Sequence, residues 1–173
     1  MEGRLSEAEA EYRAILAHEP ANSTAAFNLG IVLRRLGRVD EAVGAYRLAL
    51  TLKPVFPEAH NNLGTALGSL GRVDEAIASL RSALAQRPVF ADAWNNLGAA
   101  LKDQGKIEEA AACLENAVRL QPENHAFHSN LVFVQHYRVG ATPVDLLGVA
   151  RRWNGVHAAA LESRQQPARP AGD

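Results

Sequence analysis

The chain has 173 residues, with 18 lysines and arginines against 19 aspartates and glutamates, which gives a net charge of −1. Without a surplus of cations it is not suited to nucleic acid, because phosphate binding needs several unpaired cations on one face. The single cysteine, Cys113, excludes an internal disulfide framework. The sequence contains no run of about 18 apolar residues, the length needed to span a membrane. We therefore expect a cytoplasmic protein.

Several residue types recur with a spacing of 34 residues. The triplet Asn28-Leu29-Gly30 returns at 62–64 and again at 96–98. The prolines, glycines and alanines with the same spacing are Pro20, Pro54, Pro88, Pro122, Gly37, Gly71, Gly105, Ala42, Ala76 and Ala110. Chance does not place several residue types on one period, so the pattern indicates stacked structural repeats.

The period divides the chain into successive units. The expected units are a partial unit with its second helix only at 1–22, full units at 23–56, 57–90 and 91–124, a partial unit with a capping helix at 125–161, and a disordered tail at 162–173. The first half unit rests on Ala8, Tyr12 and Pro20, which are in register with the later units. The order predicts one elongated array rather than separate domains.

Each full unit is expected to be a hairpin of two helices. In residues 57–90, Leu63 begins the apolar face of a first helix, and Gly71 ends that helix because glycine adopts the left-handed conformation. Apolar residues at helical spacing after Ala76 predict the second helix, and Pro88 closes the unit. The residues expected to cap the second helices are Ser6, Asp40, Asp74 and Glu108.

Glycines inside the first helices predict close packing. Gly30, Gly64 and Gly98 occupy one repeat position, although a glycine inside a helix costs about 1 kcal/mol relative to alanine. We expect them to face small residues of the second helices, namely Ala42, Ala76 and Ala110. Small residues on both sides let the two helices approach closely.

A Leu-Gly pair followed by alanines and a proline on a period of 34 residues resembles the tetratricopeptide repeat (TPR). The resemblance implies an all-α, right-handed superhelical solenoid of helix-turn-helix hairpins with a C-terminal capping helix. It also implies a module that binds a protein or an extended peptide in a concave groove. No Ser/His/Asp set, paired carboxylates or phosphate loop stands out in the sequence, so we expect no catalytic residues, metal or cofactor. The family's geometry turns these residues toward the groove: Asn28, Asn62, Asn96, Asn130, Asn61, Asn95, Thr65, Lys102 and Asp103.

Four of these residues form an asparagine file, namely Asn28, Asn62, Asn96 and Asn130. A carboxamide offers an acceptor and two donors, which match the groups of an extended peptide backbone. Contacts with the backbone of the ligand, rather than with its side chains, predict that many peptide sequences bind and that sequence selectivity is low. The alternative is that these amides hydrogen-bond to the neighbouring unit or face water.

A second resemblance is shorter. Residues 129–137, 142–143 and 151–154 resemble the junction between the repeats and the catalytic half of O-linked N-acetylglucosamine transferases, especially bacterial ones. The repeats of those enzymes also carry an asparagine ladder. This resemblance implies an alternative function, the substrate-recruiting portion of such a glycosyltransferase without its catalytic half, since the chain has no Gly-rich strand-turn-helix for a nucleotide.

Other candidate residues receive structural interpretations. His125 and His128 have the spacing of zinc ligands on one helix turn, but no suitable third ligand is near in sequence. Cys113 is expected to be a buried structural thiol, because no histidine or cation flanks it on the same turn. Phe127 and Phe133 are assigned to packing.

The N-terminal half unit lacks its partner helix, which leaves an apolar edge. The residues of this edge are Leu5, Tyr12, Ile15 and Leu16. We expect weak self-association through the edge, or fraying. The pair Arg34-Arg35 is interpreted as solvated, with contact to an acidic partner as the alternative.

Overall fold

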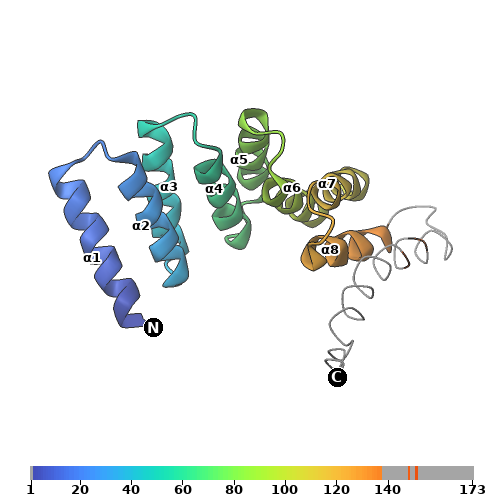
Figure 1. Ribbon diagram of the computed structural model, residues 1–173, viewed down its shortest axis with the longest axis horizontal. Helices are drawn as coiled ribbons and strands as arrows, with labels where there is room; N and C mark the ends of the chain where they lie inside the picture. Colours follow the sequence, from blue (N-terminus) through green and yellow to red (C-terminus); the bar gives the residue numbers. More distant parts are fainter. Residues whose placement is uncertain (1, 138–147, 149–150, 152–173) are drawn as a thin grey trace, which may run out of the picture.

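The computed structural model describes residues 2–137, 148 and 151, and these residues form an all-α superhelical solenoid without strands. The helices succeed one another in chain order along an elongated array (Figure 1). Their bounds are α1 Glu2–His18, α2 Ser23–Arg35, α3 Val39–Leu52, α4 Pro57–Ser69, α5 Val73–Gln86, α6 Ala91–Asp103, α7 Ile107–Leu120 and α8 His125–Gln135. The expected capping helix, apart from Gly148 and Arg151, and the expected tail at 162–173 lie outside the described residues.

The helices form an inner and an outer row. They pair as hairpins, α2 with α3, α4 with α5 and α6 with α7, and each second helix also packs on the next first helix. The first helices α2, α4, α6 and α8 contact one another in turn, whereas among the described helices no Cα atoms of α1, α3, α5 and α7 lie within 8 Å of another of these four. A close-set row beside a wide-set row curves toward the close-set one, so the first helices line the concave face.

A glycine in the left-handed region follows α2, α4 and α6, namely Gly37, Gly71 and Gly105, and fixes where the next helix begins. Gly71 has a φ of 73°, and α5 begins at Val73 with Arg72 as its N-cap. Asp74, the expected cap, lies in the first turn, where its carboxylate faces the positive end of the helix dipole. The cap predictions for Ser6, Asp40 and Glu108 are wrong in the same way, because these residues lie inside α1, α3 and α7.

The glycines inside the first helices face large side chains of the second helices. A Cβ atom on Gly64 would lie 2.6 Å from Cγ of Leu80 and 3.1 Å from the carbonyl oxygen of Ala76. The equivalent pairs are Gly98 with Leu114 and Gly30 with Tyr46. Close packing at the glycines is confirmed. Ala76 and Ala110 do face Gly64 and Gly98, through their carbonyl oxygens, but the side chain that needs the space stands four residues after each alanine.

Ion pairs join successive helices of the outer row. The pairs and their nitrogen–oxygen distances are Arg13–Glu41 at 3.2 Å, Arg47–Glu75 at 2.8 Å and Arg81–Glu109 at 3.3 Å. All six side chains are about half exposed. An exposed pair contributes on the order of 0–1 kcal/mol, so these pairs brace the outer row only loosely.

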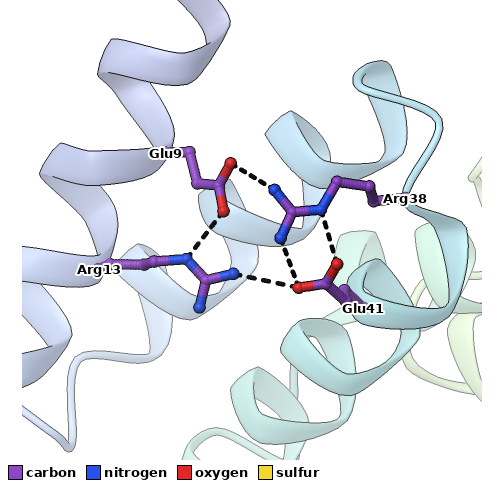
Figure 2. A network of polar contacts seen from close by, with 4 residues as sticks. All are labelled: Glu9, Arg13, Arg38 and Glu41. Atoms are coloured by element: carbon purple, nitrogen blue, oxygen red, sulfur yellow. Dashed lines mark hydrogen bonds and ion pairs between the residues drawn. The ribbon is translucent and has the colours of Figure 1, made fainter.

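A tighter ionic network holds α1 to the array, as Figure 2 shows. The Glu9 carboxylate accepts from Arg13 at 2.8 Å and from Arg38 at 2.7 Å, and Arg38 also donates two hydrogen bonds of 2.6 Å to Glu41. The Glu9 side chain is only 14% exposed. The residues at its position in later units are buried and apolar, namely Val43, Ile77 and Ala111. Charge pairing therefore replaces apolar packing where α1 joins the array.

The outward edge of α1 is only partly covered. Tyr12 is half-buried and Ile15 is 38% exposed. The residues at the same positions of the second helix pair, α4 with α5, are Leu80 and Ala83, and both are fully buried. The edge is thus patterned for a further helix, and self-association through it stays a prediction.

Replacing Gly64 by alanine is expected to lower the free energy of unfolding by about 1–2 kcal/mol, because overpacking against Leu80 exceeds the gain in helix propensity. Gly44→Ala is the matched control, since Gly44 lies inside α3 with no atom within 4 Å of an added Cβ. This control is expected to raise the stability by up to about 1 kcal/mol. Urea unfolding followed by circular dichroism measures both, and shifts of equal sign contradict the packing argument.

Acid is expected to release α1 before the rest of the array. Hydrogen bonds from Arg13 and then Arg38 lower the pKa of Glu9 below its usual 4.5. A lowered pKa means that the pairing stabilises the fold above pH 4.5 and is lost as the pH falls through the folded pKa. The amide NMR signals of α1 and α5, recorded between pH 7 and pH 3, report the order of release.

Glu9→Gln tests the same network at constant pH. We expect this variant to loosen α1 at pH 7 and to flatten the pH dependence of its signals, because the charge that pairs with both arginines is gone. Glu11→Gln is the control on the same helix, since Glu11 is exposed and makes no ion pair with a described residue. Identical behaviour of the two variants contradicts the role of Glu9.

Candidate functional site

The concave wall carries the residues that the sequence assigns to a groove. They lie at matching turns of the first helices: Asn28 on α2, Asn61, Asn62 and Thr65 on α4, Asn95, Asn96, Lys102 and Asp103 on α6, and Asn130 on α8. Asn61 is 7% exposed, and the others are half-buried or exposed. All except Asn61 are therefore at least partly accessible to solvent.

A chain of amide hydrogen bonds crosses this wall from α8 to α4. The Asn130 amide donates to Oδ1 of Asn95 at 2.8 Å, and the Asn96 amide donates to Oδ1 of Asn61 at 3.0 Å. Within the helices, Asn95 donates to Asn96 at 3.5 Å and Asn61 to Asn62 at 3.4 Å. The two short bonds join consecutive units, so these amides stabilise the stack, as the alternative interpretation of the file expected.

Asn96 is the most heavily engaged member of the file. Its amide nitrogen also lies 3.2 Å from the Thr65 hydroxyl, which in turn donates to the Asn61 backbone carbonyl at 3.0 Å. An amide nitrogen has two N–H groups, so both are occupied and the oxygen keeps acceptor capacity. Asn28 differs, since its side chain makes no hydrogen bond to a described residue.

The Tyr46 side chain, on α3, lies beside Gly30 of α2 and near Asn62 of α4. Its ring fills the space beside Gly30 that leucines fill in the next two units, and the side chain is fully buried. The hydroxyl makes no hydrogen bond of normal geometry, although Arg34 and Asn62 flank it. Burial raises the pKa of the Tyr46 hydroxyl above 10.0, so it stays protonated at neutral pH.

Two depressions open between the next pairs of first helices. The first, of about 160 Å³, lies between α4 and α6 and is lined by Gly64, Thr65, Gly68, Leu80, Asn96, Ala99, Ala100 and Asp103. The second, of about 50 Å³, lies between α6 and α8 and is lined by Ala99, Lys102, Leu114, Asn130, Phe133 and Val134. Each residue of the second stands 34 positions after a residue of the first. The two depressions are therefore one site in successive units.

An exposed aromatic pair stands beside the second depression. Phe133 and Tyr137 are 51% and 58% exposed, with ring centroids 5.2 Å apart. The Lys102 ammonium lies 5.4 Å from the Phe133 ring and 2.9 Å from the Asp103 carboxylate. The packing prediction is confirmed for the buried Phe127 but wrong for Phe133. The repeat register could have predicted this exposure, because Phe133 occupies the position of Thr65 two units later and Thr65 was assigned to the groove.

The remaining candidates have structural surroundings. Cys113 is buried, which raises its pKa to about 11, and it lines an apolar cavity of about 340 Å³ on the outer side, between α5, α6 and α7. The Trp94 indole donates to the Pro88 carbonyl at 2.8 Å, and His128 contacts the Pro122 carbonyl at the same distance. Within residues 2–137, no three His, Cys, Asp or Glu side chains gather as metal ligands, and no helix has the length and apolarity to cross a membrane.

Comparison with known families places repeats along most of the described array. Two family models described as tetratricopeptide repeat match residues 2–55 and 91–124, and a third, described as TPR repeat, matches residues 65–105. No curated protein matches the chain in sequence. These matches do not support the resemblance of residues 129–154 to O-linked N-acetylglucosamine transferases.

Solved structures share the fold. A crystal structure of MamA protein aligns with 98% of this chain and 90% of its own, with a TM-score of 0.84 and 19% identity. The crystal structure of YrrB, a TPR protein with an unusual peptide-binding site, aligns with 94% of this chain and 84% of its own, with a TM-score of 0.74 and 20% identity. The first TPR of Spaghetti (RPAP3), bound to an HSP90 peptide, covers 66% of this chain and 91% of its own, with a TM-score of 0.65 and 23% identity.

Asn96→Ala is expected to lower the free energy of unfolding by about 1–3 kcal/mol, because it leaves the buried Asn61 oxygen without its donor. Asn28→Ala makes the same change at the same register, where no hydrogen bond is lost, and is expected to shift the stability by less than about 0.5 kcal/mol. Urea unfolding of both variants gives the difference. Equal losses show that the amide chain does not stabilise the stack.

Proposed function

Because this chain is an array of tetratricopeptide repeats, we propose that it is a protein-interaction module that holds an extended polypeptide along its concave face. The observation that carries the proposal is the pair of depressions between α4, α6 and α8, which repeat one unit apart beside the amide chain. The solved repeats of RPAP3 with an HSP90 peptide and of YrrB with a peptide-binding site support it by analogy of fold.

The spacing of the wall suits an extended chain. Neighbouring helices pack roughly 8–10 Å apart, and a strand advances about 3.3 Å per residue. One unit therefore meets about every third residue of the ligand, and a side chain at that interval can enter successive depressions. Asn28, Asn62, Asn96 and Asn130 supply polar atoms beside this path.

The amides alone give weak binding. Four hydrogen bonds at about 1 kcal/mol each correspond to a dissociation constant of roughly 1 mM. The same atoms also serve the amide chain, so their contribution to a ligand is smaller still. Side chains of the ligand that enter the depressions must supply the rest of the binding free energy.

The alternative function, the substrate-recruiting part of an O-linked N-acetylglucosamine transferase-like enzyme, rests on the short resemblance of residues 129–154 alone. No contact or surface of the described residues favours it over a stand-alone binding module. We accordingly assign no catalytic role to this chain. Self-association through α1 and a cytoplasmic location stay predictions.

Blocking the wall tests the proposal. Ala99 lines both depressions, so Ala99→Gln is expected to weaken the binding of a fluorescent, unstructured peptide library at least fivefold, as measured by anisotropy. Ala112→Gln is the matched control, since Ala112 is exposed and lines the outer cavity. Equal weakening of peptide binding by both variants contradicts binding on the concave face. So do peptide-induced NMR chemical shift changes that are confined to the outer helices α3, α5 and α7.

A further inference from the structure

The concave wall differs in charge between its two ends. At the N-terminal end, Arg34 and Arg35 close α2, and both are exposed. Neither makes an ion pair with a described residue, and Arg34 lies beside the neutral hydroxyl of Tyr46. Two adjacent guanidinium groups without a carboxylate can grip an acidic side chain through paired N–H donors.

The other end is neutral and aromatic. Lys102 occupies the position of Arg34 two units later, but the Asp103 carboxylate 2.9 Å away compensates its charge. Its ammonium group also lies over the Phe133 ring. What remains for a ligand is the exposed face of Phe133 and Tyr137, a surface suited to an aromatic or large apolar side chain.

The register of the repeats fixes the distance between the two ends. Arg34 and Arg35 end α2 and Phe133 lies on α8, so three helix-to-helix steps, from α2 to α4, α4 to α6 and α6 to α8, separate the two ends. Three steps of roughly 8–10 Å amount to about 24–30 Å. An extended chain covers that distance in about seven to nine residues. Because Gly68 has no side chain, the wall between the two ends leaves room for the ligand backbone.

We propose that the groove selects an extended peptide with an acidic side chain and, about seven to nine residues away, an aromatic side chain. The acid pairs with Arg34 and Arg35, and the aromatic ring packs on Phe133 and Tyr137. This inference rests on the proposed function and names its ligand class. Single-stranded RNA also combines anionic and aromatic groups, but the net charge of −1 and the Asp103 carboxylate on the same wall favour a peptide.

Binding of labelled Ser/Gly-based peptides, measured by fluorescence anisotropy, tests the spacing. One peptide carries two adjacent glutamates and, after about seven intervening residues, a phenylalanine. A second has the same composition with these residues adjacent, and a third has glutamines in place of the glutamates. We expect the spaced peptide to bind at least tenfold more tightly than either of the others. Its advantage over the glutamine peptide is expected to shrink as NaCl rises, because salt screens the pairing with arginine.

Variants locate the two contacts. Arg34→Gln with Arg35→Gln is expected to reduce the affinity for the spaced peptide to that of the glutamine peptide, and Phe133→Ala to remove the preference for phenylalanine. Arg119→Gln is the charge-matched control, since Arg119 lies on the outer helix α7 and, among the described residues, bonds only to Asn116. This control is expected to leave the affinity unchanged.

The outcomes separate the two proposals. Equal binding of all three peptides, still weakened by Ala99→Gln, overturns the inference and leaves the proposed function standing. Binding of none of the peptides, or binding that Ala99→Gln does not affect, overturns both. Tighter binding of an oligouridine than of the spaced peptide also overturns the inference, because the same groups then serve RNA.

Discussion

A large side chain of each second helix lies against a glycine of the first helix, and this contact sets the geometry of the array. Tyr46, Leu80 and Leu114 occupy space that a side chain on the first helix would need. Since each first helix also touches the next one, the concave row is the compact side of the solenoid.

The length of the bridging side chains follows from this difference between the rows. On the inner row, asparagine is long enough to reach the next unit, as Asn96 does to Asn61. On the outer row, the helix backbones are farther apart, and a long arginine must meet a long glutamate, as in Arg47 and Glu75. Because the array is curved, the close-set inner row is connected by short neutral amides, and the wide-set outer row is connected by long, exposed ion pairs.

The period of 34 residues predicts the helices, their pairing and the turn glycines, and all of these are confirmed. The period does not determine the direction in which each side chain points around the axis of its helix. Adjacent residues differ by about 100° around a helix, so Asn61 is buried and Asn62 is half-exposed although both were assigned to the groove. Phe133 was missed because its residue type suggests packing, whereas its register places it on the groove wall. The cap predictions for Asp40, Asp74 and Glu108 were wrong because an acidic side chain is also favourable inside the first turn, where it faces the positive end of the helix dipole.

The amide chain has a consequence for how the wall can bind. An N–H group that joins Asn96 to the next unit cannot at the same time bond to a ligand. The asparagines of α4, α6 and α8 therefore act first by holding these three helices in a fixed relation, and on the proposed function this reduces the ordering cost of binding. On the proposed function, the selectivity for a peptide ligand then depends on groups that do not hold the repeats together. Those groups are the unpaired arginines at one end and the exposed aromatic pair at the other, at a separation that the repeat itself dictates.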